Sequence, residues 1–182
     1  MLDVYHEWLK NEKPRDINGS VDHSLKMFFL WRTIQDTKAT TFVESGTSHG
    51  DAIAAMLPFV SKVFSVEAHL SSYEFASARF KDNEDVEILF GNSADLLGDI
   101  VSKVDGNAVV WLDAHYSGDG TALLDKETPI EEELRIFAEL DNKQNFSLVV
   151  CSERAGRRGF ASARARRNSP HTPLPPRPRG DD

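Results

Sequence analysis

Residues 40–67 read TTFVESGTSHGDAIAAMLPFVSKVFSVE, and this stretch decides the fold. TTFVE and KVFSVE are short runs rich in Val and Phe, a composition that favours β-strands. Between them, DAIAAMLPFV begins with Asp and has apolar residues three and four positions apart, which is typical of an amphipathic helix. The order strand, glycine-containing loop, helix, strand predicts two parallel strands with a helix packed on them.

The same alternation continues along the chain to residue 151. Three further strand candidates are VEILFG (86–91), AVVWLD (108–113) and FSLVVC (146–151), and helix candidates are SSYEFASARFKD, SADLLGDIVSKV and PIEEELRIFAELDNK. SVDHSLKMFFLWRTIQ (20–35) predicts a leading helix over one side of the sheet. We therefore expect an α/β fold, a Rossmann-like parallel sheet with helices on both faces, in which residues 1–39 form a helical cover and residues 40–150 the main domain.

Composition narrows the class of protein. The chain has 182 residues, 40% of them hydrophobic, which suffices for one domain with a sizeable core. No run of about 18 apolar residues occurs, and the N-terminus is charged where a signal peptide is apolar, so we expect a cytoplasmic protein that does not enter a membrane. The single cysteine, Cys151, excludes an internal disulfide. Residues 1–150 hold 13 basic and 26 acidic residues, which argues against a nucleic-acid partner for this part.

Residues 151–182 have a different composition. They contain 8 Arg and 3 acidic residues, with no Lys, Ile, Val, Met, Trp or Tyr. Such a segment cannot bury enough apolar surface to offset its ordering entropy, so we expect an Arg/Pro-rich, disordered tail. One hypothesis is a frameshift near residue 150 that replaces the native C-terminus. The alternative is a natural basic, proline-rich tail that binds a partner or an acidic surface.

The loop after the first strand candidate is a possible ligand site, because open parallel sheets bind ligands at the carboxyl ends of their strands. Glu44 ends that strand, and Gly46 and Gly50 flank a tight loop that opens a helix. Glycines allow a close approach of backbone to ligand, and a helix N-terminus offers free N–H groups. The spacing is not G-x-G-x-x-G, which argues against a nicotinamide or flavin enzyme.

The next two strand ends carry further polar residues. Glu67 ends the second strand and can accept hydrogen bonds from both hydroxyls of a ribose, although a solvated strand-end acid has the same pattern. Asn92 and Ser93 follow the third strand, where they suit either an adenine edge or a simple helix cap.

The fourth strand ends in AVVWLDAHYSGDG (108–120), with Asp113 and His115 at its tip. His115 is a candidate general base because an imidazole titrates at about 6.5, near neutral pH; the alternative is a polar loop residue. SGDGTALLDKETPIEEEL (117–134) predicts a mobile flap over an acceptor site. The acidic run 131–133 is interpreted as the negative first turn of a helix, with no chemical role.

Together, VESGTSHG, Glu67, GNSAD and VVWLDAHYSG resemble the motifs of class I S-adenosylmethionine-dependent methyltransferases, in particular small-molecule O-methyltransferases related to catechol and macrolide-sugar enzymes. The resemblance covers residues 40–150 and implies methyl transfer to a hydroxyl of a small-molecule acceptor, with a sugar or a glycosylated metabolite as candidates. For this reaction our candidate catalytic residues are His115 as the general base and Asp113 as the group that orients the histidine or the acceptor hydroxyl, or that holds a metal if one binds. The cofactor-binding residues that the resemblance implies are Glu44, Gly46, Thr47, Gly50, Glu67, Asn92 and Ser93.

Two departures from the family pattern leave alternatives open. In metal-dependent members the fourth-strand acid ligates a divalent cation and a lysine follows three residues later; here Asp113 is the only candidate ligand, and Tyr116 stands at the lysine position. A divalent metal and the oligomeric state therefore stay open. The family's sheet also has a sixth and a seventh strand, which this chain is expected to lack. The alternative functions are a catalytically inactive S-adenosylmethionine-binding remnant and a partner-binding module that uses the basic tail.

Overall fold

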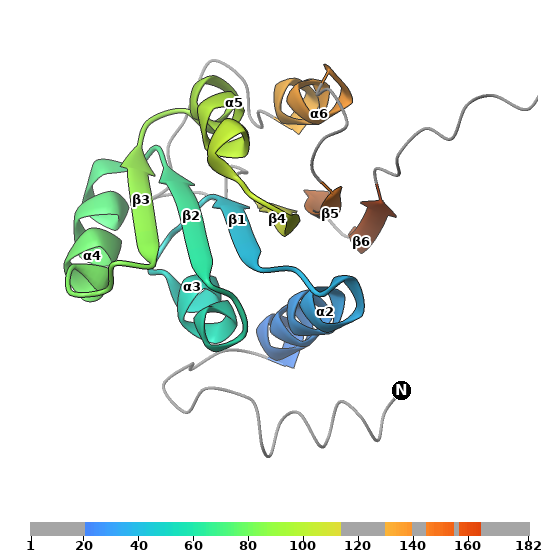
Figure 1. Cartoon of the computed structure of the whole chain (residues 1–182), viewed down its shortest axis with the longest axis horizontal. Helices are drawn as coiled ribbons and strands as arrows, with labels where there is room; N and C mark the ends of the chain where they lie inside the picture. Colours follow the sequence, from blue (N-terminus) through green and yellow to red (C-terminus); the bar gives the residue numbers. More distant parts are fainter. Residues whose placement is uncertain (1–20, 114–129, 140–144, 155–156, 165–182) are drawn as a thin grey trace, which may run out of the picture.

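A single sheet of six strands organises the molecule (Figure 1). The computed structural model describes residues 21–113, 130–139, 145–154 and 157–164. The strand order is β3-β2-β1-β4-β5-β6; β1 to β5 are parallel, and β6 is antiparallel to β5. The strands are β1 (Thr41–Ser45), β2 (Lys62–Glu67), β3 (Val86–Phe90), β4 (Asn107–Leu112), β5 (Asn145–Arg154) and β6 (Arg157–Arg164).

Helices cover both faces of this sheet, which confirms the predicted α/β fold. The helices are α2 (Val21–Thr37), α3 (Asp51–Met56), the short 3₁₀ helix η1 (Leu57–Phe59), α4 (Leu70–Phe80), α5 (Ser93–Lys103) and α6 (Ile130–Glu139). In Figure 1, α2 and α3 lie on one side of the sheet, and α5 and α6 lie on the other.

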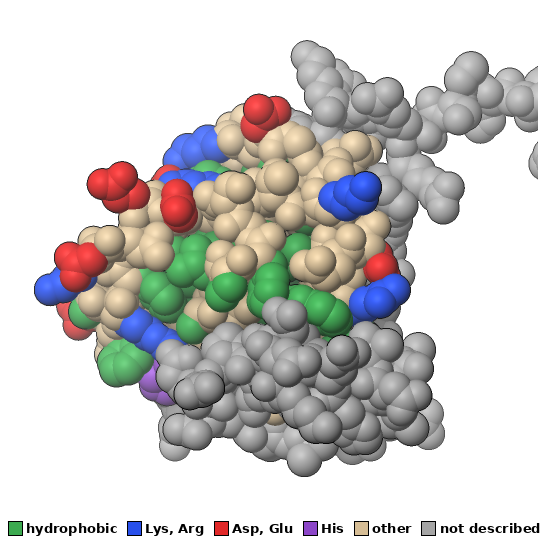
Figure 2. Space-filling model, turned by 60° about the horizontal axis from the view of Figure 1, so that its bottom comes forward, with side chains coloured by type: hydrophobic (Ala, Val, Ile, Leu, Met, Phe, Trp, Pro, Cys, Tyr) green, Lys and Arg blue, Asp and Glu red, His purple; other side chains and the backbone are tan. Residues whose placement is uncertain are grey.

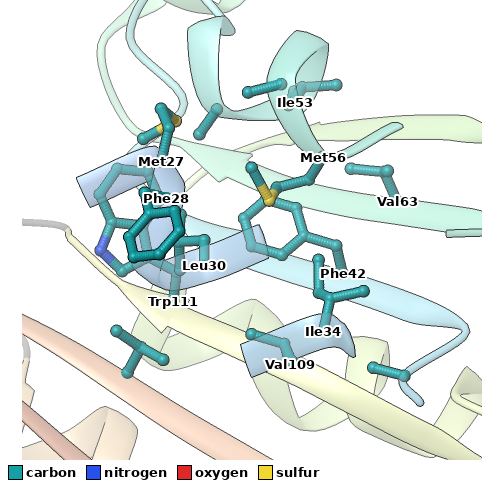
Figure 3. Close-up of a cluster of buried hydrophobic side chains, with 14 residues drawn as sticks. Met27, Phe28, Leu30, Ile34, Phe42, Ile53, Met56, Val63, Val109 and Trp111 are labelled. Atoms are coloured by element: carbon teal, nitrogen blue, oxygen red, sulfur yellow. The ribbon is translucent and has the colours of Figure 1, made fainter. Parts of the chain in front are cut away.

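Two apolar clusters hold these layers together. The first lies between the sheet and α2 and α3, where aromatic, Met and branched side chains interdigitate (Figure 3). The second lies between the sheet and α5 and α6, and includes the ring contact of Phe137 with Phe146, whose centroids are 5.5 Å apart. Because both faces of β1 and β4 are covered, nearly every residue of these strands is buried. This explains the continuous apolar run of β4, AVVWL.

The strand order places a topological switch point between β1 and β4. From β1 the chain proceeds through β2 to β3, and it then returns to the other side of β1 to form β4 and β5. Glu44 pairs in register with Ser65 of β2 and with Trp111 of β4, so the carboxyl ends of these three strands lie at one level. Such a switch point is where open α/β sheets bind ligands.

The C-terminal strands differ from the sequence-based expectation. Strand β5 continues past residue 150 to Arg154, and Arg157–Arg164 pairs with it as β6, although disorder was expected from residue 151. Pairing of two backbones needs main-chain hydrogen bonds rather than apolar side chains, so the Arg- and Ala-rich composition of this segment did not predict it. Residues 165–182, the remainder of the predicted tail, lie outside the described residues.

Charged and apolar side chains are interspersed on the surface. In the view of Figure 2 the hydrophobic side chains lie across the middle and the charged ones lie around the margins. None of the helices within the described ranges is both long enough and apolar enough to cross a membrane.

Candidate functional site

The loop that joins β1 to α3 is shaped by two glycines with positive φ. Gly46 has φ 85° and donates its N–H to the carbonyl of Val66 at 2.9 Å, so the loop starts against the end of β2. Gly50 has φ 78° and precedes α3. A Cβ atom at Gly50 would lie 2.5 Å from Cε2 of Phe80, so the sequence needs glycine here for both conformation and space.

Helix α4 holds this loop from outside. Nη1 of Arg79 donates to the carbonyl oxygen of His49 and to Oδ1 of Asp51, each at 2.7 Å. The ring of His49 also meets the ring of Phe75 edge-on, with centroids 5.2 Å apart. Two residues of α4, Arg79 and Phe75, thus support the conformation of the glycine loop from outside.

Glu67 is fixed by two backbone N–H groups at the end of β2. Its Oε2 accepts from the N–H of Ser48 at 2.7 Å, and its Oε1 accepts from the N–H of His69 at 2.8 Å. A carboxylate has about four acceptor positions, so each oxygen keeps one for a ligand. Because Ser48 belongs to the glycine loop, this contact joins the two loops that the sequence assigns to the cofactor.

Glu44 lies buried beneath the same edge. Its Oε2 accepts a hydrogen bond from the Ser65 hydroxyl at 2.8 Å, and the Thr47 hydroxyl lies 2.6 Å from that of Ser65. Burial raises the pKa of the Glu44 carboxyl well above its ordinary value, and the Ser65 hydrogen bond opposes the rise. The negative charges of Asp113, Glu67 and Asp51 raise it further. The edge therefore brings the negative charges of Asp113 and Glu67 close to Glu44, which favours a cationic ligand.

Asn92 and Ser93 occupy the β3 end, and both serve the start of α5. The side-chain oxygen of Asn92 accepts from the N–H of Ala94 at 3.1 Å, which is the helix cap that the sequence offered as one interpretation. Ser93 is buried at the first position of α5. Their contact with an adenine stays a prediction.

Asp113 lies directly after β4 and next to the end of β1. Its N–H donates to the carbonyl of Ser45 at 3.2 Å, and its negative charge helps to raise the pKa of Glu44. The described part of the chain contains no group of three or more His, Cys, Asp or Glu residues that could hold a metal ion. His115, Tyr116 and residues 117–129 of the predicted flap lie outside the described residues, so the role of His115 stays a prediction.

Sequence reasoning missed two buried polar residues of this edge. Ser65 links Glu44 to Thr47; its position two residues before Glu67 in a strand, and hence on the same face, was a signal. Glu133 was interpreted as part of the negative first turn of a helix with no chemical role, yet its exposed fraction is 0%. Its spacing of three from Ile130 and four from Phe137 places it on the apolar face of α6.

Three solved structures of methyltransferases have a similar arrangement. The O-methyltransferase TomG of Streptomyces achromogenes, solved with SAM, matches with a TM-score of 0.55 and 18% identity over 81% of this chain and 61% of TomG. An O-methyltransferase of Bacillus cereus in complex with SAH matches with a TM-score of 0.51 and 18% identity over 82% and 63% of the two chains. The SAH-bound methyltransferase PaMTH1 of Podospora anserina matches with a TM-score of 0.52 and 15% identity over 81% of this chain and 60% of PaMTH1.

The fold is that of the class I S-adenosylmethionine-dependent methyltransferases, as the resemblance of the sequence implied. The chain spans about three fifths of the length of these three structures. No protein-family profile matches the sequence, and a search of curated proteins finds no match.

Proposed function

We propose that this chain binds S-adenosylmethionine at the carboxyl edge of β1, β2 and β4 and transfers its methyl group to a hydroxyl of a small molecule. The observation that carries the proposal is the fixed Glu67 carboxylate, which accepts the N–H groups of Ser48 and His69 and keeps one acceptor position on each oxygen. Two acceptors on one rigid group match the two neighbouring hydroxyls of a ribose.

The charge of the edge supports the same ligand. S-adenosylmethionine carries a sulfonium and an ammonium group, and Glu44 lies where the charges of Asp113, Glu67 and Asp51 act together. A cation at this place would relieve the mutual repulsion of these acids. The backbone of the glycine loop, which turns at the positive φ values of Gly46 and Gly50, would accommodate the methionine end.

For the transfer itself, bound S-adenosylmethionine supplies a methyl group on a cationic sulfur, which the hydroxyl oxygen of the acceptor attacks. The protein must align the acceptor and remove its hydroxyl proton. His115 is our candidate for the base that takes this proton, and Asp113 is the candidate that orients His115 or the acceptor. If a divalent metal takes part, Asp113 is also its candidate ligand.

Calorimetric titration of the full chain with S-adenosylhomocysteine tests the cofactor part of this proposal. We expect binding by the unchanged chain, and a loss of about tenfold or more in Glu67→Ala, because two charge-assisted hydrogen bonds are removed. Glu84→Ala removes the same charge from an exposed loop and is the matched control. No binding at millimolar ligand, or equal binding by Glu67→Ala, contradicts the proposal.

Methyl transfer to a set of hydroxylated metabolites tests the catalytic part. We expect His115→Ala to bind the cofactor normally and to lose turnover by about 10²- to 10⁴-fold, the usual contribution of a general base. Unchanged turnover in this variant would remove His115 from the mechanism.

A second candidate function is cofactor binding without turnover. Tyr116, which stands where metal-dependent members of the family have a lysine, favours it. Cofactor binding by the unchanged chain together with no methyl transfer to any acceptor would support this alternative.

A further inference from the structure

Two hydroxyl groups join the buried Glu44 to the glycine loop. Oγ of Ser65, within β2, donates to Oε2 of Glu44 at 2.8 Å, and Oγ1 of Thr47 lies 2.6 Å from Oγ of Ser65. All three side chains are buried, with exposed fractions of 1% for Glu44, 0% for Ser65 and 3% for Thr47. We call Glu44, Ser65 and Thr47 the buried polar chain.

The number of available protons fixes the direction of these hydrogen bonds. A serine hydroxyl has a single proton to donate, and Ser65 donates it to Glu44. The contact between the two hydroxyls is therefore a hydrogen bond from Thr47 to Ser65, which uses the proton of the Thr47 hydroxyl. The Thr47 oxygen is left with acceptor capacity alone, so it suits a ligand group that donates.

The charge at the other end of the buried polar chain favours the same kind of ligand. Burial and the negative charges of Asp113 and Glu67 disfavour the ionised form of Glu44 and raise its pKa, whereas the hydrogen bond from Ser65 favours that form. A positively charged group bound at this edge would favour the ionised form further. An ionised carboxylate only accepts hydrogen bonds, so such a ligand would keep the chain in the direction described.

We infer that Ser65 is a positioning residue for the ammonium group of the cofactor: it holds the Thr47 hydroxyl with its oxygen free to accept, so this part of the site binds the ammonium rather than the carboxylate of the methionine end. The inference rests on the proposed function and deepens it. A carboxylate at the same place would need a donor, and Thr47 can donate to it only by giving up its hydrogen bond to Ser65.

Two substitutions interrupt the buried polar chain in the full-length protein. Ser65→Ala removes the group that orients Thr47, and Thr47→Val removes the acceptor while it keeps a β-branched side chain. We expect each variant to bind S-adenosylhomocysteine about tenfold more weakly in calorimetric titrations, because a hydrogen bond to a charged group is lost. Thr47→Ser keeps a hydroxyl group and should retain most of the affinity.

The matched controls make the same changes at exposed positions. Thr40→Val and Ser61→Ala lie outside the buried polar chain and should leave the affinity for S-adenosylhomocysteine unchanged. Circular dichroism shows whether each variant is folded. Thr47→Val carries the test by itself if Ser65→Ala does not fold.

Ligands that lack one charged group locate the effect. For the analogue of S-adenosylhomocysteine without its amino group, both variants should bind as well as the unchanged chain, within about twofold, because the interaction is already absent. For the analogue without its carboxylate, the loss of about tenfold should persist. A residue that only maintains the fold would weaken the binding of every ligand by the same factor.

Three results would overturn the inference while the proposed function stands. They are the same fold-loss for all three ligands, a loss for the ligand without the amino group but not for the one without the carboxylate, and unchanged affinity for all three ligands in the folded variants. Failure of the unchanged chain to bind S-adenosylhomocysteine would overturn both the inference and the proposed function.

Discussion

Replacement of Gly50 by alanine tests whether the glycine loop has the conformation described here. Alanine at φ 78° is strained by about 1–2 kcal/mol. Its Cβ would also lie 2.5 Å from Cε2 of Phe80, and overpacking of this kind costs about 1–3 kcal/mol. We therefore expect Gly50→Ala to lower the free energy of unfolding by about 2–5 kcal/mol.

Urea denaturation followed by circular dichroism measures this change, and Gly98 supplies the matched control. Gly98 lies exposed on α5, and a Cβ atom there would meet nothing within 4 Å. Gly98→Ala should therefore raise the free energy of unfolding by about 0.5–1 kcal/mol, the helix preference of alanine over glycine. Phe80→Leu in the Gly50→Ala background should recover part of the loss. Equal stability of Gly50→Ala and the unchanged chain would refute the described loop.

Three further predictions concern the buried acids. The pKa values of Glu44 and Glu133 are raised in the folded chain, so both carboxyl groups stay protonated to a higher pH there than in the unfolded chain. The free energy of unfolding should therefore fall as the pH rises from ordinary carboxyl pKa values through the raised ones, by at most about 1.4 kcal/mol per pH unit for each group. Glu44→Gln should make this pH dependence weaker in urea titrations at several pH values. Ser65→Ala should lower the free energy of unfolding by about 1–3 kcal/mol, because it leaves the buried Glu44 oxygen and Thr47 hydroxyl without their shared partner, whereas Ser61→Ala on the surface should change it by less than about 0.5 kcal/mol. Binding of cationic S-adenosylmethionine should release a proton from Glu44, seen as a binding enthalpy that depends on the ionisation enthalpy of the buffer; an enthalpy independent of the buffer would argue against this placement of the cation.

The sequence predicted the parallel part of the sheet well because apolar runs and helical periods alternate from residue 40 onward. Strands buried on both faces must be apolar throughout, and helices on the faces must be amphipathic, so both leave clear patterns. Strand β6 has neither feature. Its place is set by backbone pairing with β5, which composition does not record.

The candidate site was predictable where residues end strands. Glu44, Glu67 and Asp113 follow apolar runs, and parallel strands bring such ends to one edge. Glu133 was not predicted, because an acidic run at a helix start suggests a solvated first turn. Only the packing of α6 against α5 shows which of its three adjacent glutamates is fully buried.

The most direct test of the central claim is the coupling between Glu67 and the ribose hydroxyls of the ligand. Dissociation constants are measured for S-adenosylhomocysteine and its 2′-deoxy analogue, with the unchanged chain and with Glu67→Ala. If Glu67 binds the ribose, removal of the hydroxyl should weaken binding to the unchanged chain by about tenfold and should have little further effect in Glu67→Ala. An equal loss for both proteins would show that Glu67 does not contact the ribose and would contradict the proposed cofactor site.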